Sequence, residues 1–269
     1  MISFPNIKIN LGLYITAKRN DGFHNLESVF YPVPFTDVLE IIPSQKFSFY
    51  TEGIAATENA EDNLCVKAYR LLQKDYELPP VEMFLLKHIP TGAGLGGGSS
   101  DASFTLKALN KLFELNITDG KLIDYAAQLG SDCPFFIVNK PAYVFGRGEL
   151  QEQVDLDLSG KFITIVHAGI HISTKEAFAN ISPAEANIKV FRLPFIPLAA
   201  WRNMLNNDFE PYAFRTYPVL NDIKNQLYTL GAEYVSMSGS GSAIYAISEK
   251  CLDVADEWRR KWLVWQGKL

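Results

Sequence analysis

The most constraining feature of this sequence is a glycine-rich run at residues 90–101, in which five of seven consecutive residues are glycine. A strand-like apolar stretch at residues 81–87 precedes it, and apolar residues at helical spacing follow it from Ala102 to Phe113. Without Cβ atoms, a glycine backbone can adopt positive φ and bring several N–H groups to one anion, and a helix N-terminus adds further donors. The order of strand, glycine loop and helix therefore predicts a phosphate-binding loop.

The common phosphate-loop motifs do not fit this run. Gly92, Gly94 and Gly97 match the dinucleotide fingerprint, but the acidic residue expected about 20 positions later would fall between two helical patterns. Ser99 follows the glycines where a Walker loop needs lysine, and the protein-kinase motifs HRD and DFG are absent from the sequence. A Rossmann oxidoreductase and a protein kinase are both disfavoured.

Composition limits the remaining classes. The chain has 269 residues, 48% apolar and 20% charged, as expected for a globular protein, and its net charge of −5 does not favour nucleic acid or anionic membranes as partners. Its three cysteines are scattered, which is typical of a reducing compartment. No signal peptide and no apolar run of about 18 residues is visible, so we expect a cytoplasmic protein.

The pattern along the chain mixes strands and helices without a strict βαβ rhythm, which predicts an α+β fold. Strands are predicted at residues 7–15, 28–35, 37–42, 46–51, 81–87, 135–138, 142–145, 161–167, 231–235 and 244–247. Helices are predicted from Leu64 onward with Asp62 or Asn63 as N-cap, after the glycine run, and at 119–129, 173–179, 198–206, 219–230 and 252–265. Asp101 is expected to cap or charge the first turn of the helix that follows the glycines.

Three motifs in order resemble those of the galactokinase, homoserine kinase, mevalonate kinase and phosphomevalonate kinase superfamily. They are residues 7–11 near the N-terminus, the glycine run, and a second glycine-serine loop at residues 238–243. Further segments narrow the resemblance to its family of 4-diphosphocytidyl-2-C-methyl-D-erythritol kinases, in the non-mevalonate isoprenoid pathway. These segments are residues 8–13, 21–24, 61–64, 130–136, 146–149 and 173–178. Phe23 stands where this family usually has tyrosine, and residues 184–207 match none of its motifs.

The resemblance implies a two-domain α+β GHMP kinase. Residues 1–155 would form the ATP-binding domain, with the ribosomal protein S5 domain 2-like fold, and residues 156–269 an α/β-plait-like C-terminal domain, with the active site in the cleft between them. The implied reaction transfers the γ-phosphoryl of ATP, with Mg²⁺, to the 2-hydroxyl of 4-diphosphocytidyl-2-C-methyl-D-erythritol. The implied partner is thus a cytidine diphosphate polyol.

The resemblance also implies roles for individual residues. Asp132 would accept or orient the proton of the substrate hydroxyl, and Lys8 would stabilise the transferring phosphoryl group, although strand alternation alone places Lys8 in solvent. The residues implied to bind ATP are Asn63, Lys87, Pro90, Gly92, Ala93, Gly94, Leu95, Gly96, Gly97, Gly98, Ser99 and Ser100. Without the resemblance, Asn63 is equally explained as a helix cap and Asp132 as a turn residue or cap.

Substrate binding is implied for Asn10, Phe23, His24, Thr174 and Phe178. Phe23 and Phe178 would sandwich the cytosine ring while His24 bonds its edge; without the resemblance, both phenylalanines would be core residues. Two alternatives stay open. One is a superfamily kinase for mevalonate, homoserine or a sugar, which needs no cytidine pocket, and the other is a catalytically silent ATP-binding module.

Overall fold

The computed structural model describes residues 1–54 and 59–269, which divide into two compact units. Each unit is built from segments that are far apart in the sequence. The first comprises Met1–Ile7, Phe35–Thr91 and Gly96–Lys140, and the second comprises Lys8–Pro34, Gly92–Leu95 and Pro141–Leu269. The two units are described separately below, and the expected domain boundary at residue 155 stays a prediction.

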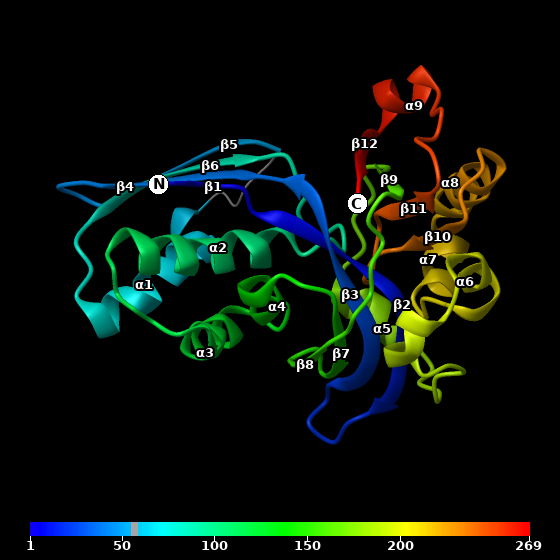
Figure 1. The fold of residues 1–269 in the computed structure, drawn as a ribbon, viewed down its shortest axis with the longest axis horizontal. Coiled ribbons are helices and arrows are strands. Elements are labelled where there is room, and N and C mark those ends of the chain that lie inside the picture. The colour runs from blue at the N-terminus through cyan, green and yellow to red at the C-terminus, as the bar shows by residue number, and fades with distance from the viewer. Residues whose placement is uncertain (55–58) are drawn as a thin grey trace. The chain divides into compact units, whose positions relative to one another are not determined.

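The first unit is a four-stranded sheet covered by helices. Its strand order is β1 (Ile2–Ser3), β4 (Val38–Pro43), β6 (Val81–Lys87) and β5 (Ser48–Gly53), and only the β5–β6 pair is parallel. The helices are α1 (Leu64–Tyr76), α2 (Gly97–Leu112), α3 (Asp119–Leu129) and α4 (Cys133–Val138), after a 3-10 turn at Ala60–Asp62. Helices α1 and α2 lie along one face of this sheet (Figure 1), and apolar side chains from both layers form one buried cluster.

The second unit contains most of one four-stranded sheet and all of another. The first has the order β2 (Asn6–Lys18), β3 (His24–Thr36), β7 (Ala142–Gly146) and β8 (Leu150–Gln153). The other has the order β10 (Tyr234–Met237), β11 (Ile244–Ser248), β9 (Phe162–His167) and β12 (Leu263–Lys268), with every neighbouring pair antiparallel.

The helices of the second unit pack around a core of its own. They are α5 (Thr174–Ala179), α6 (Leu198–Met204), α7 (Glu210–Thr216), α8 (Pro218–Thr229) and α9 (Asp256–Lys261), with a 3-10 segment at Val190–Phe195. Leu220, Ile223 and Leu227 form the buried stripe of α8, at the helical spacing that the sequence indicated. This helix packs on β10 and β11 (Figure 1), which flank the second glycine-serine loop.

Two predicted elements are wrong. The strand predicted at 135–138 is helix α4, because Pro134 lies in its first turn, where the fixed φ of proline favours a helix. Every residue from Cys133 to Ile137 is buried, so the apolar run carried no periodicity that could separate strand from helix.

The helix predicted at 252–265 is confined to Asp256–Lys261, and Leu263–Lys268 is strand β12, paired with β9. Aromatic and β-branched residues at 262–265 favour an extended strand, and β9 offers an edge to pair with. Trp258 is buried in α9, whereas Trp265 lies on β12.

Candidate active site

The glycine run forms the loop between β6 and α2 that the sequence predicted. Gly92, Gly94 and Gly96 have φ values of 69°, 78° and 72°, in the left-handed region that favours glycine. Gly96 is the N-cap of α2, and no side chain there accepts a hydrogen bond from the first turn. The helix therefore begins with backbone N–H donors at its positive end, the arrangement that binds phosphate.

Close contacts with neighbouring segments explain why glycine stands at two of these positions. A Cβ atom on Gly94 would lie 1.9 Å from the carbonyl oxygen of Ser238, in the second glycine-serine loop. A Cβ atom on Gly97 would lie 2.7 Å from the Ile89 side chain. The glycines thus permit contact between neighbouring segments as well as positive φ.

Lys8 is buried on β2, with 3% of its surface exposed, so the solvent-facing position that alternation suggests is wrong. The sequence alternates over residues 7–11, but both faces of β2 are covered by other parts of the protein. The Lys8 ammonium donates to Asn10 Oδ1 at 2.7 Å and to the Gly94 carbonyl at 3.2 Å, and lies 4.4 Å from the centroid of the Phe30 ring. Lys8 is therefore held against the glycine loop.

Asn10 is held as firmly as Lys8. Its Nδ2 donates to Ser28 Oγ at 3.0 Å, and Ser28 Oγ donates to the Gly12 carbonyl at 2.6 Å. These two bonds fix the amide so that Oδ1 faces the Lys8 ammonium. Lys8 and Asn10, two positions apart, thus share one face of the strand.

Asp132 lies in the first unit, half-buried, at the N-cap position of α4. It has the position of a helix cap, but its side chain makes no capping hydrogen bond. A capping role therefore does not explain why an aspartate stands at this position, although the helix N-terminus stabilises its negative charge. Lys8 belongs to the other unit, so the expected Lys8–Asp132 partnership stays a prediction.

Two of the residues expected to bind cytosine contact each other in the structure. The His24 and Phe178 rings stack with centroids 5.0 Å apart and an interplanar angle of 25°. Phe23 is 56% exposed on the turn before β3, and the Arg147 guanidinium lies 5.1 Å from its ring centroid. Thr174 is exposed at the first position of α5, the helix that carries Phe178. His24 thus lies on a face of the Phe178 ring, where cytosine was expected, rather than at the edge of the base, and Phe23 is an exposed aromatic ring.

Asn63 and Lys87, both predicted to bind ATP, make hydrogen bonds or ion pairs with other residues of the protein. Asn63 is the N-cap of α1, and its Oδ1 accepts from Cys65 N at 2.9 Å. Lys87 is 5% exposed and forms ion pairs with Asp37 and Asp101. Direct contact of either residue with ATP stays a prediction, and the contacts described here hold α1 and the base of the glycine loop.

Asp101 does not cap helix α2 as expected. The helix begins at Gly97, so Asp101 falls in its second turn, where it is buried and its Oδ2 accepts from Lys87 at 2.7 Å. Its Oδ1 is buried without a hydrogen-bond partner. Burial raises the pKa of Asp101 to about 7, and the charge of Asp37 acts in the same direction. Burial alone would lower the pKa of Lys87, but the two carboxylates raise it overall, so Lys87 keeps its proton.

Sequence reasoning missed several residues that complete these networks. Asp37 Oδ1 accepts from the backbone N–H groups of His88 and Ile89, just before the glycine loop. Asn207 and Glu210 contact the second glycine-serine loop and the strand before it. Their only sequence signal was a polar cluster at 206–210 that interrupts an apolar pattern.

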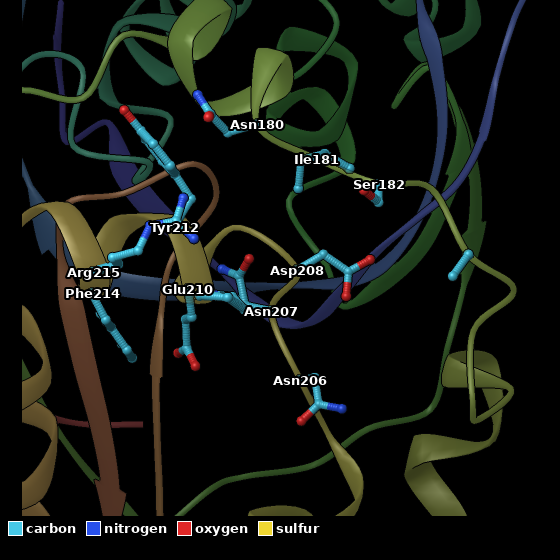
Figure 2. A pocket seen from close by; sticks show the side chains of 12 residues that line it. Asn180, Ile181, Ser182, Asn206, Asn207, Asp208, Glu210, Tyr212, Phe214 and Arg215 are labelled. Atoms are coloured by element: carbon cyan, nitrogen blue, oxygen red, sulfur yellow. The ribbon is translucent and has the colours of Figure 1, made fainter.

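A cavity of about 520 Å³ in the second unit lies beside the same polar segment (Figure 2). Its lining comes from residues 180–184 and 206–215. Among the described residues, the lining includes none of those predicted to bind ATP or substrate. The cavity therefore adds no support for the predicted site.

Residues 1–54 and 59–269 contain neither a cluster of metal-binding side chains nor a helix that could span a membrane. No group of three or more His, Cys, Asp or Glu side chains in this part of the chain is arranged to hold a metal ion. None of the helices described there is long and apolar enough to cross a membrane.

Known proteins resemble this chain over most of its length. Residues 63–140 match the GHMP kinases N terminal domain, and residues 196–262 match the GHMP kinases C terminal domain. A protein of Bacteroides thetaiotaomicron named 4-diphosphocytidyl-2-C-methyl-D-erythritol kinase is 51% identical over 253 residues, which are 93% of this chain and 92% of the relative. This chain belongs to that family of GHMP kinases.

Two further comparisons agree with this membership. A Bacteroides fragilis protein of the same name is 49% identical over 251 residues, 92% of each chain. A crystal structure of 4-(cytidine 5'-diphospho)-2C-methyl-D-erythritol kinase matches with a TM-score of 0.85 and 29% identity, over 99% of this chain and 98% of that one. The family resemblance and the two-domain α+β fold expected from the sequence are confirmed, and the chain is an ATP-dependent phosphotransferase.

Proposed function

We propose that this protein transfers the γ-phosphoryl group of ATP to the 2-hydroxyl of 4-diphosphocytidyl-2-C-methyl-D-erythritol. Within this family, the observation that carries the proposal is the stacked pair of His24 and Phe178. A cytosine ring binds well against an aromatic face, and stacking contributes about 1–3 kcal/mol per base in nucleic-acid binders. Mevalonate, homoserine and galactose carry no ring of this kind.

The loop between β6 and α2 would bind the triphosphate. Positive φ at three glycines and an N-cap without a capping side chain leave backbone N–H groups for phosphate oxygens. These donors are fixed before the ligand arrives, so they need not reorganise during the reaction.

Lys8 and Asp132 would serve the reacting groups. The Lys8 ammonium would stabilise the charge on the transferring phosphoryl group, and Asp132 would accept or orient the proton of the attacking hydroxyl. Because phosphoryl transfer depends mainly on positioning and charge stabilisation, one cation and one carboxylate suffice as side-chain chemistry. The tight fixing of Lys8 by Asn10 and Gly94 supports this role.

Mg²⁺ fits the described residues as a partner of the nucleotide. Where a protein offers no cage of side chains, Mg²⁺ is held by substrate phosphates, waters and one or two protein oxygens. The absence of a three-ligand cluster in the described ranges agrees with that mode, and Ser99, half-buried in the first turn of α2, is the candidate protein ligand. When bound, the ion would neutralise charge on the phosphate oxygens.

ATP consumption by the purified protein tests the function. It is measured with 4-diphosphocytidyl-2-C-methyl-D-erythritol, mevalonate, homoserine and galactose as separate acceptors. We expect turnover with the cytidylated polyol alone. Turnover with another acceptor would retain the phosphate loop and reject the cytidine pocket. ATP binding with no turnover on any acceptor would identify a silent module.

A further inference from the structure

The side chain of Asn207 makes three hydrogen bonds inside the second unit. Asn207 is 2% exposed, and its Nδ2 donates to the Met237 carbonyl at 2.8 Å and to the Gly239 carbonyl at 2.9 Å. Its Oδ1 accepts from Phe209 N at 2.9 Å. Figure 2 shows Asn207 between Asp208 and Glu210, on the segment that leads into α7. Because this buried amide donates both of its N–H groups to carbonyls of one short segment, it fixes the position of that segment.

The two carbonyls that Asn207 binds lie on either side of Ser238, at the start of the second glycine-serine loop. Ser238 Oγ donates to the Gly94 carbonyl at 2.8 Å. The same carbonyl accepts the Lys8 ammonium at 3.2 Å. The Asn207 amide is therefore connected to the ammonium of Lys8 through the backbone on either side of Ser238, the Ser238 side chain and the Gly94 carbonyl.

The segment that carries Asn207 is also hydrogen-bonded to β2, the strand that carries Lys8. Leu13 N donates to the Asn206 carbonyl at 2.8 Å, and Asp208 N donates to the Leu13 carbonyl at 2.9 Å. The Asp208 carboxylate accepts from Ile15 N at 2.7 Å. Asn207 is thus anchored to β2 through its backbone neighbours and to the loop through its side chain.

We propose that Asn207 is a positioning residue for phosphoryl transfer, holding the second glycine-serine loop so that Ser238 and Gly94 keep the Lys8 ammonium in place. Asn207 acts through other residues and touches no reacting group. The inference rests on the proposed role of Lys8, but the arrangement it describes can be measured without any acceptor substrate.

The first test is chemical labelling of lysine amines with acetic anhydride, read by mass spectrometry, in Asn207→Ala and Ser238→Ala. Wild-type Lys8 should label slowly, because it is buried and hydrogen-bonded. Loss of Asn207's bonds should raise Lys8 labelling about tenfold. Lys87 is the internal control, since it is also buried and its ammonium pairs with Asp37 and Asp101 inside the first unit.

The matched control variant is Asn206→Ala. Asn206 is exposed, and its contact with β2 is made by the backbone carbonyl, which the substitution retains. Lys8 labelling should equal that of the wild type. If Lys8 stays protected in both Asn207→Ala and Ser238→Ala, or if its labelling rises only together with that of Lys87, the proposal is overturned.

The second test is kinetic and uses whichever acceptor supports turnover. Asn207→Ala should lower kcat by about 10- to 100-fold, with the KM for ATP within about twofold of the wild type, because a shift of about 1 Å costs rate more than binding. The double variant Asn207→Ala/Ser238→Ala should lose little more than either single variant, since both act through one path. Fully additive losses would overturn the inference, whereas failure of the cytidylated polyol as acceptor would overturn only the proposed substrate.

Discussion

The Lys8 ammonium lies 2.7 Å from Oδ1 of Asn10, two positions further along the same strand. Both side chains are buried, and Asn10 is oriented in turn by Ser28. The neutral amide of Asn10, itself held by Ser28, sets the direction of the Lys8 ammonium. This relationship favours a cation that is positioned before phosphate binds.

Lys8→Met should lower kcat at least about 100-fold, because loss of a preorganised charge at the transferring group costs that much in comparable sites. Methionine retains most of the side-chain volume, so the melting temperature should change little. Steady-state kinetics and a thermal melt check both statements. Lys18→Met, at the exposed end of the same strand, should behave like the wild type.

Asp132→Asn should leave ATP affinity within about twofold and lower turnover by about 100- to 10,000-fold, the usual range for loss of a proton acceptor. Calorimetric titration with ATP and initial rates separate the two effects. Asp124→Asn, an exposed substitution on α3, is the matched control. Near-normal turnover in Asp132→Asn would remove this carboxylate from the mechanism.

Gly94→Ala should abolish turnover and lower the melting temperature, because the new Cβ would lie 1.9 Å from a backbone oxygen at a φ of 78°. Gly120→Ala provides the contrast. Gly120 lies in helix α3 with open space around it, so alanine should stabilise the protein by up to about 1 kcal/mol. Thermal or urea denaturation measures both, and an undamaged Gly94→Ala would contradict the close packing described for the loop.

Phe178→Leu should raise the KM for the cytidylated acceptor by about 5- to 100-fold and leave the KM for ATP unchanged, because it removes the aromatic face and keeps an apolar side chain. Phe195→Leu serves as the control, since Phe195 is 84% exposed. Kinetics with each substrate varied in turn give the two constants. Equal losses for both substrates would point to a damaged fold rather than to a lost stacking partner.

The buried carboxyl of Asp101 predicts a pH dependence of stability. Its pKa is raised from 3.8 to about 7, so the folded protein binds more protons than the unfolded chain between about pH 4 and 7. Its contribution to stability therefore falls as pH rises through this window. Asp101→Asn should flatten that fall, measured as the melting temperature from pH 4.5 to 7.5. An unchanged slope would assign the dependence to other groups.

The sequence alone located the glycine loop, the α2 and α3 helices and most strands, because these elements carry local signals: glycine clusters, caps and periodicity. The sequence-based predictions were wrong where contacts between distant parts of the chain determine the structure. Strand alternation alone placed Lys8 in solvent, because it does not reveal that both faces of β2 are covered, and only the family resemblance indicated a functional lysine. Asp101 looked like a helix cap because its partner Lys87, fourteen positions earlier on another element, has no local signature.

Asn207 and Glu210 were missed for a related reason. Their partners are backbone atoms about 30 residues away. Backbone carbonyl and N–H groups do not differ between residue types in a way that would mark one of them as a partner. The strand predicted from a short apolar run was wrong for a different reason. Residues 135–137 are all buried, so only Pro134 indicated that a helix begins there.

The discontinuous make-up of the second unit has a consequence for how the chain folds. Strand β3 leaves the ribosome early, but its neighbour β7 pairs Leu26 with Gly146, so the edge of β3 must wait for a segment made much later. Contacts of such high sequence separation slow folding and lengthen exposure of an unpaired strand. A fragment ending at residue 140 would keep that edge open permanently, so truncation at the end of the first unit is expected to yield an aggregating product rather than an isolated ATP-binding domain.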